Sequence, residues 1–369
     1  MDSDRQHSIH GLLDGSQRGT GAALLLGILR CAEPFYAGAM RLRNWMYDRG
    51  CFSAHRVQAP VISVGNITAG GTGKTPVVCW LADRLRREGM HPAILLRGYK
   101  RKNGSGDEED LLRESLSAGA PVIVHAQPDR VAGALQVLRE HPEVNAIILD
   151  DGFQHRRLRR DFELVLIDAT SPFGHGHVHP RGLLREPLEG LNRADAIVLT
   201  RCDLVPDSTR EEIEQKLREM SPAAAIYRAR HELAGMRSEA ISAAAAPDLP
   251  IELLESTPFF AFAGIANPEA LHRQLWQFGE SYRAHHWFAD HHAYVDDDLR
   301  RMQEAARSAG AAMLVVTEKD WRKLRRLACF REGPLPIRRL ALSIQFGPPG
   351  EDGLVELIQT RIEKNRPEP

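Results

Sequence analysis

Residues that could bind a phosphate group follow an apolar run early in the chain. The run Val61–Val64 leads into Gly-Asn-Ile-Thr-Ala-Gly-Gly-Thr-Gly-Lys-Thr, which ends at Thr75. Glycines let backbone N–H groups converge on phosphate oxygens, a lysine brings positive charge to the outer phosphates, and a threonine can offer its hydroxyl to Mg²⁺ where a helix begins. We therefore predict a phosphate-binding loop made of Thr68, Ala69, Gly70, Gly71, Thr72, Gly73, Lys74 and Thr75.

This loop does not match the strict pattern G-x-x-x-x-G-K-[ST], because Thr68 stands at its first position. A glycine-rich turn without a ligand is the alternative. The order of strand, glycines, Lys-Thr and helix favours phosphate binding. The helix is indicated by Val77, Leu81 and Leu85, which recur four residues apart.

A pair of acidic residues follows another apolar run. Ala146–Leu149 leads into Asp150 and Asp151. A carboxylate at the tip of a strand beside a phosphate-binding loop can hold Mg²⁺ directly or through water. On an extended chain adjacent side chains diverge, so one carboxylate could contact the metal while the other orients water or the loop. An acidic turn is the alternative, but the Lys-Thr pair upstream favours the metal site.

Three later stretches contain residues that could move a proton, and each is weak evidence alone. They are Gly104–Asp110, Leu184–Pro187 and Trp287–His292. An acidic residue on a glycine-hinged loop could accept a proton from a substrate hydroxyl, and a histidine could share that proton. A solvated acidic loop and a histidine pair in a turn are the alternative interpretations.

Apolar and amphipathic segments alternate along the chain, as in repeated βα units. Strands are predicted at 92–96, 121–124, 146–149, 163–167 and 196–199, with a helix capped by Asp129 between the second and third. Such units predict an α/β fold of the phosphate-loop NTPase type, with a mostly parallel sheet and helices on both faces. The predicted domains are a phosphate-loop domain over 51–237, an alanine-rich linker over 238–256, and a smaller C-terminal α/β domain over 257–369 that completes the active-site cleft.

Composition is that of an ordinary soluble protein. The 369 residues are 43% hydrophobic and 26% charged, and the net charge of −1 argues against a broad nucleic-acid-binding surface. The five cysteines are scattered and form no C-x-x-C pair, which indicates reduced thiols in a cytosolic compartment. We expect a monomer without a nucleic-acid partner.

The first fifty residues combine a polar start with apolar segments. We predict a mobile extension over 1–20 and an amphipathic helical segment over 21–50. The apolar run 22–29 ends at Arg30, short of the ~20 residues that span a bilayer, so neither a transmembrane helix nor a secretory signal is predicted. After Pro34, an apolar helical face accompanied by arginines could lie in a membrane interface or pack on its own domain.

Several motifs together resemble those of the tetraacyldisaccharide 4′-kinases, the lipid A 4′-kinase family. Two long strings are highly specific, namely the one in the phosphate-binding loop and Asp-Asp-Gly-Phe-Gln-His at 150–155. The resemblance covers the chain from about Pro34 to Leu324. It rests on these segments in the family's order: Val64–Pro76, Arg97–Tyr99, Gly106–Glu108, Asp150–Arg157, Leu184–Leu188, Asp290–His292 and Thr317–Asp320.

The resemblance implies transfer of the γ-phosphoryl group of ATP, with Mg²⁺, to the 4′-hydroxyl of a tetraacylated glucosamine disaccharide 1-phosphate. By motif, Lys74 would hold the phosphates, Thr75 and Asp151 would serve Mg²⁺, and Asp150 would support that site. Phosphoryl transfer depends mostly on positioning and charge neutralisation, which such a set of residues could supply.

On the acceptor side, the resemblance implies that Asp107 acts as the base on the 4′-hydroxyl, paired with His291, and that Glu186 lines the same cleft. It also implies a location at the cytoplasmic face of the bacterial inner membrane. A lipid substrate that stays in the bilayer would explain the N-terminal segment, whose arginines would favour anionic headgroups. We therefore expect a peripheral or monotopic association of this segment with the membrane.

One stretch departs from the family pattern Phe-Gly-Asn-Gly-x-Leu-Leu-Pro-x-Gly. Here Phe173–Gly182 contains His175, His177 and His179. On an extended strand these alternating side chains would share one face and could bind a metal, but no fourth ligand is apparent. A local variation of the substrate loop is the favoured interpretation.

Two functions from other classes are the alternatives. A phosphate-loop GTPase, acting as a switch or metal-insertion chaperone, would use Leu199–Asp203, which resembles the guanine-reading pattern [NT]-K-x-D. Against it, Arg201 replaces the lysine, and Asp150–Gly152 lacks the D-x-x-G spacing of a γ-phosphate switch. The other alternative, a membrane-associated ATPase without an acceptor, would hydrolyse ATP without stimulation by lipid.

Overall fold

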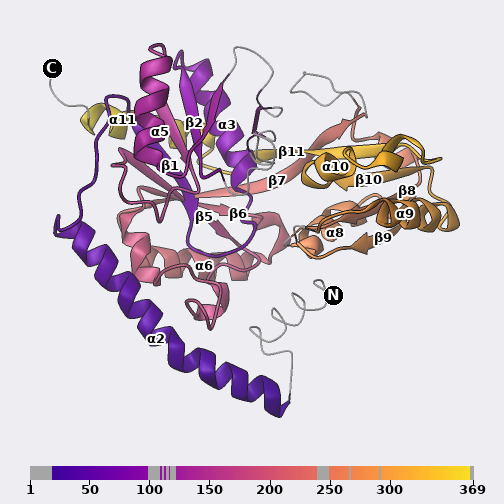
Figure 1. The fold of residues 1–369 in the computed structure, drawn as a ribbon, viewed down its shortest axis with the longest axis horizontal. Coiled ribbons are helices and arrows are strands. Elements are labelled where there is room, and N and C mark those ends of the chain that lie inside the picture. The colour runs from indigo at the N-terminus through magenta and orange to yellow at the C-terminus, as the bar shows by residue number, and fades with distance from the viewer. Residues whose placement is uncertain are drawn as a thin grey trace. The chain divides into compact units, whose positions relative to one another are not determined.

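The computed structural model describes residues 19–98, 109, 112–113, 116, 122–238, 249–265, 267–290 and 292–365. These residues divide into two compact units. Unit 1 contains residues 232–343, and unit 2 contains the described residues before 232 and after 343. Figure 1 labels their helices and strands.

Unit 2 is built on a sheet whose strands follow the order β3-β2-β4-β1-β5-β6-β7. The neighbouring strands pair in parallel, which confirms the predicted mostly parallel sheet. The strands are β1 (Val61–Asn66), β2 (Pro92–Leu96), β3 (Ile123–Ala126), β4 (Ala146–Asp150), β5 (Phe162–Asp168), β6 (Ala196–Thr200) and β7 (Ala225–Arg237), the last of which continues into unit 1.

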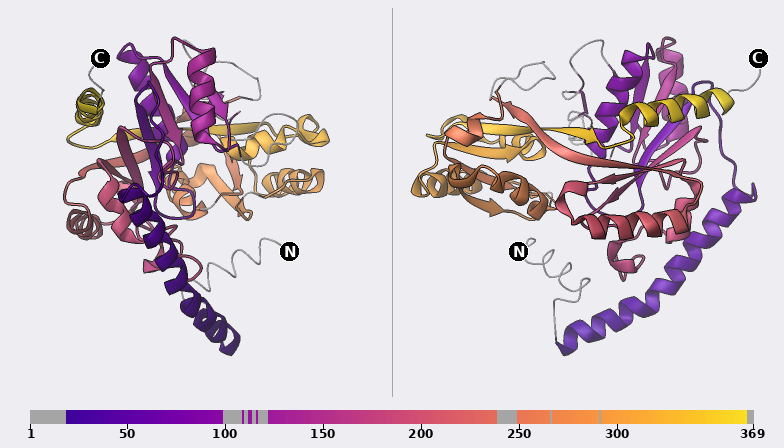
Figure 2. Two further views of the ribbon diagram at one scale, coloured as in Figure 1. Left: turned by 60° about the vertical axis from the view of Figure 1, so that its left-hand side comes forward. Right: turned by 180° about the vertical axis from the view of Figure 1, so that it is seen from behind.

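Helices cover both faces of this sheet (Figure 2), as predicted. On one face, α3 (Lys74–Arg87) and α11 (Glu351–Asn365) share an apolar core with the strands. On the other face lie α5 (Arg130–Glu140) and α6 (Asp207–Met220). Fully buried strands supply both cores because successive side chains point to opposite faces. The carboxylate of Asp129 caps α5 by accepting hydrogen bonds from two N–H groups of its first turn.

A long helix, α2 (Thr20–Asp48), precedes the sheet. It is the predicted N-terminal helical segment and continues through Pro34, so the apolar run 22–29, which alone was too short to span a bilayer, is part of a longer helix. By length and composition it is apolar and long enough to cross a membrane. Among its residues only Ala37 is buried, and its N-terminal half extends beyond the sheet and helices of unit 2 (Figures 1 and 2). Residues 1–18 of the predicted extension lie outside the described residues.

Unit 1 is a second, smaller α/β structure. Its strands follow the order β11-β10-β8-β9 and pair in parallel. They are β8 (Phe259–Ala263), β9 (Tyr282–Trp287), β10 (Met313–Thr317) and β11 (Ile337–Phe346), the last three residues of which belong to unit 2. One face of these strands packs on α9 (Asp296–Ser308) and α10 (Glu318–Leu324), and the other packs on α7 (Leu253–Ser256) and α8 (Pro268–Trp276).

Short 3₁₀ helices occur in the connections of both units. They are η1 (Gly174–Gly176), η2 (Leu188–Arg193), η3 (Cys202–Leu204), η4 (Gly279–Ser281) and η5 (Ala328–Arg331). The predicted domain bounds stay predictions. The C-terminal helix α11 belongs to unit 2, because its apolar side chains pack against the core that α3 shares with the sheet.

Candidate active site

The phosphate-binding loop connects the buried strand β1 to α3, in the order that the sequence predicted. Gly73 stands just before the helix with φ 80° and ψ 29°, a left-handed conformation that glycine adopts without steric cost. A Cβ atom at Gly73 would lie 2.2 Å from Cε1 of His231, so the close approach also requires glycine. The hydroxyl of Thr72 is buried without a hydrogen-bond partner in the described structure, as expected of a loop built to receive a ligand.

Lys74 lies in the first turn of α3 and faces two oxygen atoms. Its Nζ donates to Oδ1 of Asn66 at 3.1 Å and lies 3.3 Å from Oδ1 of Asp151. The buried Asn66 in turn donates from Nδ2 to the carbonyl of Thr68 at 2.7 Å. Asn66 thus ties the lysine to the start of the loop. Sequence reasoning gave it no role, although it stands in the family string.

The two acidic residues lie at the end of β4, beside the loop. The sequence argument assumed an extended chain, but Asp151 has φ 53°, so the backbone turns there. Arg185 donates from Nη1 to Oδ1 and Oδ2 of Asp151 at 2.7 and 2.9 Å. Burial raises the pKa of Asp151, but Lys74 and Arg185 outweigh burial and hold that pKa below its usual value. Asp151 is therefore an ionised carboxylate at neutral pH, as a Mg²⁺ ligand must be.

Glu186 is enclosed rather than open to a cleft, with 1% of its surface exposed. It accepts two hydrogen bonds from Nη2 of Arg193, at 3.0 and 2.9 Å. Further donors are Nδ2 of Asn44 on α2 at 2.8 Å and Nε2 of Gln154 at 3.1 Å. Gln154 also donates to the carbonyl of Asn66 at 3.0 Å. The carboxylate therefore connects α2 to the phosphate-binding loop, a role that the motif alone could not indicate.

The stretch 173–185, which we name the histidine loop, runs beside the phosphate-binding loop. The N–H of Ala69 donates to the carbonyl of Leu183 at 2.6 Å, and the N–H of Arg185 donates to the carbonyl of Ile67 at 2.8 Å. Thr68 and Leu184 form an antiparallel bridge. The two loops therefore form one backbone structure at the end of β1.

The histidines of this loop do not lie on an extended strand. His175 has φ 63° within η1, whereas Nδ1 of His177 lies 3.0 Å from Oε1 of Glu33 on α2. The ring of His179 makes an edge contact with the ring of Tyr36, 6.0 Å between centroids, and the Tyr36 hydroxyl donates to a carbonyl of the same loop. The described residues contain no group of three or more His, Cys, Asp or Glu that could hold a metal ion. Two of the histidines that depart from the family pattern, His177 and His179, instead contact α2.

The segment Leu199–Asp203 touches the phosphate-binding loop from the end of β6. Oγ1 of Thr200 donates to the carbonyl of Thr72 at 3.2 Å, and Nη1 of Arg201 donates to the carbonyl of Gly71 at 3.0 Å. Arg201 also pairs with the buried Asp168. The residues of this segment that resemble a guanine-reading pattern therefore bind the backbone of the phosphate-binding loop.

The predicted proton-transfer residues Asp107 and His291 both lie outside the described residues, so their pairing stays a prediction. In unit 1, Asp320 of the Thr-Glu-Lys-Asp motif is fully buried. It accepts hydrogen bonds from the N–H of Gly264 at 3.0 Å and from the hydroxyl of Tyr294 at 2.9 Å. That motif therefore organises the interior of unit 1.

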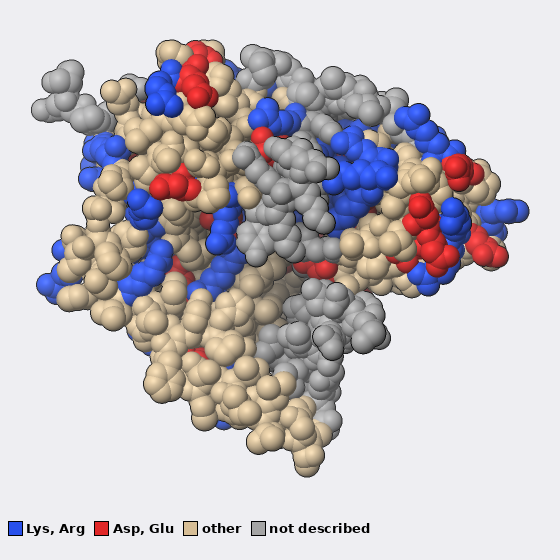
Figure 3. All heavy atoms as spheres, in the orientation of Figure 1, with Lys and Arg blue, Asp and Glu red and all other residues tan. Residues whose placement is uncertain are grey.

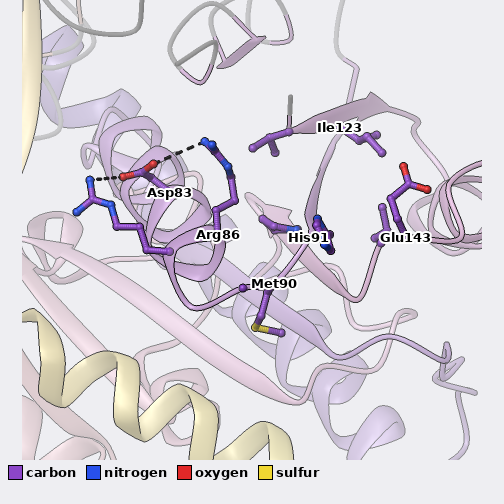
Figure 4. Close-up of a pocket in the computed structure, with 11 residues that line it drawn as sticks. Asp83, Arg86, Met90, His91, Ile123 and Glu143 are labelled. Carbon is purple, nitrogen blue, oxygen red and sulfur yellow. Dashed lines mark ion pairs between the residues drawn. The ribbon is translucent and has the colours of Figure 1, made fainter. Parts of the chain in front are cut away.

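A separate cavity lies at the far end of α3 (Figure 4). It is lined by residues of the last turns of that helix and of the chain before β2 and β4, among them Asp83, Arg86, His91 and Glu143. Asp83 pairs with Arg86 and Arg87, so the carboxylate is neutralised locally. Because α3 begins at Lys74, this cavity is about two and a half turns away from the phosphate-binding loop and is not part of the site.

Comparisons with known proteins agree with the motifs. The sequence matches the family described as tetraacyldisaccharide-1-P 4′-kinase over residues 25–363. A tetraacyldisaccharide 4′-kinase of Geobacter metallireducens is 38% identical over 317 residues, which are 82% of this chain and 89% of the relative. That of Halothermothrix orenii is 32% identical over 333 residues, 84% and 85% of the two chains. The crystal structure of Aquifex aeolicus LpxK in complex with ATP has a TM-score of 0.67 and 27% identity, covering 92% of this chain and 99% of that one.

Proposed function

The chain belongs to the tetraacyldisaccharide 4′-kinase family and is an ATP-dependent kinase of lipid A biosynthesis, and we propose that it phosphorylates the 4′-hydroxyl of a tetraacyldisaccharide 1-phosphate at the site around Lys74. One observation carries the proposal. Lys74, Asp151 and Arg185 form a continuous chain of contacts, 3.3 and 2.7 Å long, at the end of the phosphate-binding loop. The kinase relatives favour this function over the GTPase alternative.

On the donor side, the loop amides and Lys74 hold the triphosphate of ATP. The lysine is prepositioned by Asn66 and Asp151, so binding requires little reordering of its side chain. Its charge lies next to the phosphate oxygens, where negative charge shifts during transfer. Arg185 is a second cation within this network, and we assign it to the same charge balance.

Mg²⁺ fits the residues that surround the loop. Thr75, Asp150 and Asp151 would hold the ion, which supplies neutralisation of the β- and γ-phosphate charge. The carboxylate of Asp151 is suited to this task because Lys74 and Arg185 keep it ionised despite its burial. We assign Asp151 as the direct ligand and Asp150 as the supporting residue.

On the acceptor side, Asp107 is the base that accepts the proton of the 4′-hydroxyl, and His291 orients and stabilises that base. This assignment rests on the motifs Gly106–Glu108 and Asp290–His292. If the two residues act as one unit, Asp107→Ala and His291→Ala lower turnover non-additively while ATP affinity is unchanged. Strictly additive losses would contradict the pairing.

Glu186 acts through its neighbours rather than on the substrate. Its oxygen atoms are occupied by Arg193, Asn44 and Gln154, and it is 1% exposed. We assign it the task of holding Gln154 and the loop end beside Arg185. Glu186→Gln should therefore lower turnover only partly, because the amide keeps one of the two oxygen atoms that accept hydrogen bonds.

We place the enzyme at the membrane surface, as a monomer on the cytoplasmic face, with α2 as its contact. The exposed apolar side chains of α2 include Leu24, Ile28, Phe35 and Leu42, which are 57–81% exposed. Figure 3 shows that the surface over the N-terminal half of α2 presents almost no Lys, Arg, Asp or Glu. An apolar helix face beside a site for a lipid substrate supports interfacial binding.

The test is transfer of label from γ-labelled ATP to a tetraacyldisaccharide 1-phosphate in detergent micelles. We expect labelling of the lipid to require Mg²⁺ and Lys74. We expect no labelling when GTP replaces ATP as the phosphate donor. Release of phosphate from GTP without labelled lipid would support the GTPase instead. ATP hydrolysis that lipid does not stimulate would support an ATPase without an acceptor.

A further inference from the structure

Two side chains at the end of β6 hold consecutive carbonyl groups of the phosphate-binding loop. Nη1 of Arg201 donates to the carbonyl of Gly71 at 3.0 Å, and Oγ1 of Thr200 donates to the carbonyl of Thr72 at 3.2 Å. Thr200 is fully buried, and its single O–H is shared between the carbonyl of Thr72 and that of Ile167, which lies at 3.3 Å. These contacts fix two peptide groups of the loop rather than its side chains.

Arg201 is itself held in place by a carboxylate. Asp168, at the end of β5, is 6% exposed and pairs with Nη1 of Arg201. Its Oδ1 accepts hydrogen bonds from the N–H and Oγ1 of Thr170, at 3.0 and 2.7 Å. Arg201 also has φ 56°, which is uncommon outside glycine and requires support from its surroundings. The ion pair with Asp168 therefore holds the guanidinium of Arg201, and the surrounding structure holds its backbone.

A neighbouring histidine completes this support from β7. The His231 ring packs closely against Gly73, where a Cβ atom would leave it no room. Burial and the nearby Arg201 lower the pKa of His231 to about 4, so the ring is neutral at physiological pH. Three consecutive loop residues, 71–73, thus each contact a side chain from the end of β6 or from β7.

The orientation of these peptide groups has a direct consequence for anion binding. In a planar trans peptide the C=O and the following N–H point in opposite directions. Holding the carbonyls of Gly71 and Thr72 toward β6 therefore turns the N–H groups of Thr72 and Gly73 to the other side of the loop. N–H groups that converge in this way form an anion-binding concavity.

We propose that Arg201, held by Asp168, and Thr200 are positioning residues for phosphoryl transfer that set the amide groups of the phosphate-binding loop before ATP binds. The inference rests on the proposed function, because it takes residues 68–75 as the donor site. Preset donors need no reorganisation during the reaction, so their loss should weaken the donor site selectively. It also gives the segment Leu199–Asp203 a task other than reading guanine.

The test compares four variants in the full chain, with KM for ATP, KM for the lipid and thermal unfolding measured for each. Arg201→Ala removes the guanidinium, Arg201→Lys keeps one donor, and Thr200→Val removes one hydroxyl at nearly constant volume. The matched control is Arg228→Ala, because Arg228 pairs with the buried Glu214 at 2.5 and 3.0 Å without contacting the loop.

We expect Arg201→Ala to raise KM for ATP about 10- to 100-fold, as for loss of a charged hydrogen bond, with KM for the lipid unchanged. Thr200→Val should raise KM for ATP about three- to tenfold, and Arg201→Lys should recover most of the loss. Arg228→Ala should leave KM for ATP within about twofold of the wild-type value, although its loss of thermal stability is similar to that of Arg201→Ala.

Equal KM values for ATP in Arg201→Ala and Arg228→Ala would overturn the proposal and leave Arg201 a structural role. If Arg201→Ala does not fold, Arg201→Lys and Thr200→Val decide in the same way. A wild-type chain that labels no lipid would contradict the proposed function instead. In that case ATP affinity is measured by calorimetry. A lower affinity in Thr200→Val than in the wild type would still support the positioning role of Thr200.

Discussion

The phosphate-binding loop and the histidine loop lie side by side but are held by different parts of unit 2. The first is tied to the ends of buried strands through Asn66, Thr200 and Arg201. The second is tied to α2 through Glu33 and Tyr36. A sheet interior cannot shift without losing its core, whereas α2 has one buried residue. The phosphate-binding loop, which we propose as the donor side, is therefore fixed by the sheet, whereas the histidine loop, which we take as part of the acceptor side, depends on α2.

This difference suits the two substrates. ATP is soluble and can enter a rigid site, which benefits from preset amides. A lipid acceptor stays in a bilayer, so a loop beside it would gain from a connection to α2, the element that we propose contacts the membrane. The network of Asn44, Glu186 and Gln154 joins the two sides.

The largest effect should come from the donor side. Lys74→Ala removes a positioned cation from the phosphates, and we expect kcat/KM for ATP to fall by about 10²–10³-fold. Steady-state kinetics of lipid phosphorylation measures it. Lys216→Ala, on the exposed side of α6, is the control and should leave the rate unchanged. A loss below about threefold in Lys74→Ala would remove the lysine from the donor site.

Membrane contact should respond next. Replacing Leu24, Ile28 and Phe35 with serine removes three exposed apolar side chains from α2, and sedimentation with anionic vesicles should show binding weakened by about a hundredfold. Leu135→Ser is the control, because this leucine is 55% exposed on α5. If Leu135→Ser reduces vesicle binding as much as the triple change, α2 is not the membrane contact.

The connection between α2 and Glu186 should contribute to stability. Asn44→Ala removes one donor to a buried carboxylate, so the free energy of unfolding should fall by about 1–3 kcal/mol in denaturant titrations. The comparison variant is Arg41→Ala on the same helix, whose ion pair with Glu189 is 59% and 65% exposed. That pair should contribute at most about 1 kcal/mol. Equal losses in the two variants would show that burial of Glu186 does not strengthen the contact.

The smallest expected effect is the pH dependence that His231 adds. Its pKa is about 4 in the folded chain, below the ordinary value of 6.5, so the unfolded chain binds the proton first. The contribution of His231 to stability is complete above pH 6.5 and is lost as the pH falls toward 4. Between pH 6 and 5 the unfolding free energy should fall by about 1 kcal/mol more than in His231→Gln. Parallel pH profiles of the two proteins would contradict a buried neutral His231.

Sequence patterns predicted the strand, the glycine-rich loop and the helix around Lys74 because their signals are local. The loop follows the buried strand β1, and α3, which begins at Lys74, shows its apolar spacing within a few turns. The predicted strands of the sheet are present for the same reason. The turn at Asp151 was not predicted, because nothing in a pair of aspartates specifies a positive φ.

The contacts that hold these elements could not be predicted, because they join distant parts of the chain. Asn44 meets Glu186 across 142 residues, and Arg201 meets Gly71 across 130. The helical segment over 21–50 was predicted, but its passage through Pro34 as one continuous helix was not specified, since proline inside a helix removes one hydrogen bond. The roles of Asp107 and His291 stay predictions from motifs.

The most direct test of the separation between the two sides is a crossed comparison of two variants. KM for ATP and KM for the tetraacyldisaccharide 1-phosphate are measured in the same micelles for Thr200→Val and for Glu33→Ala, which removes the contact of α2 with His177. We predict that Thr200→Val raises only KM for ATP and that Glu33→Ala raises only KM for the lipid. A rise of both constants together in either variant would contradict a donor side held by the sheet and an acceptor side held by α2.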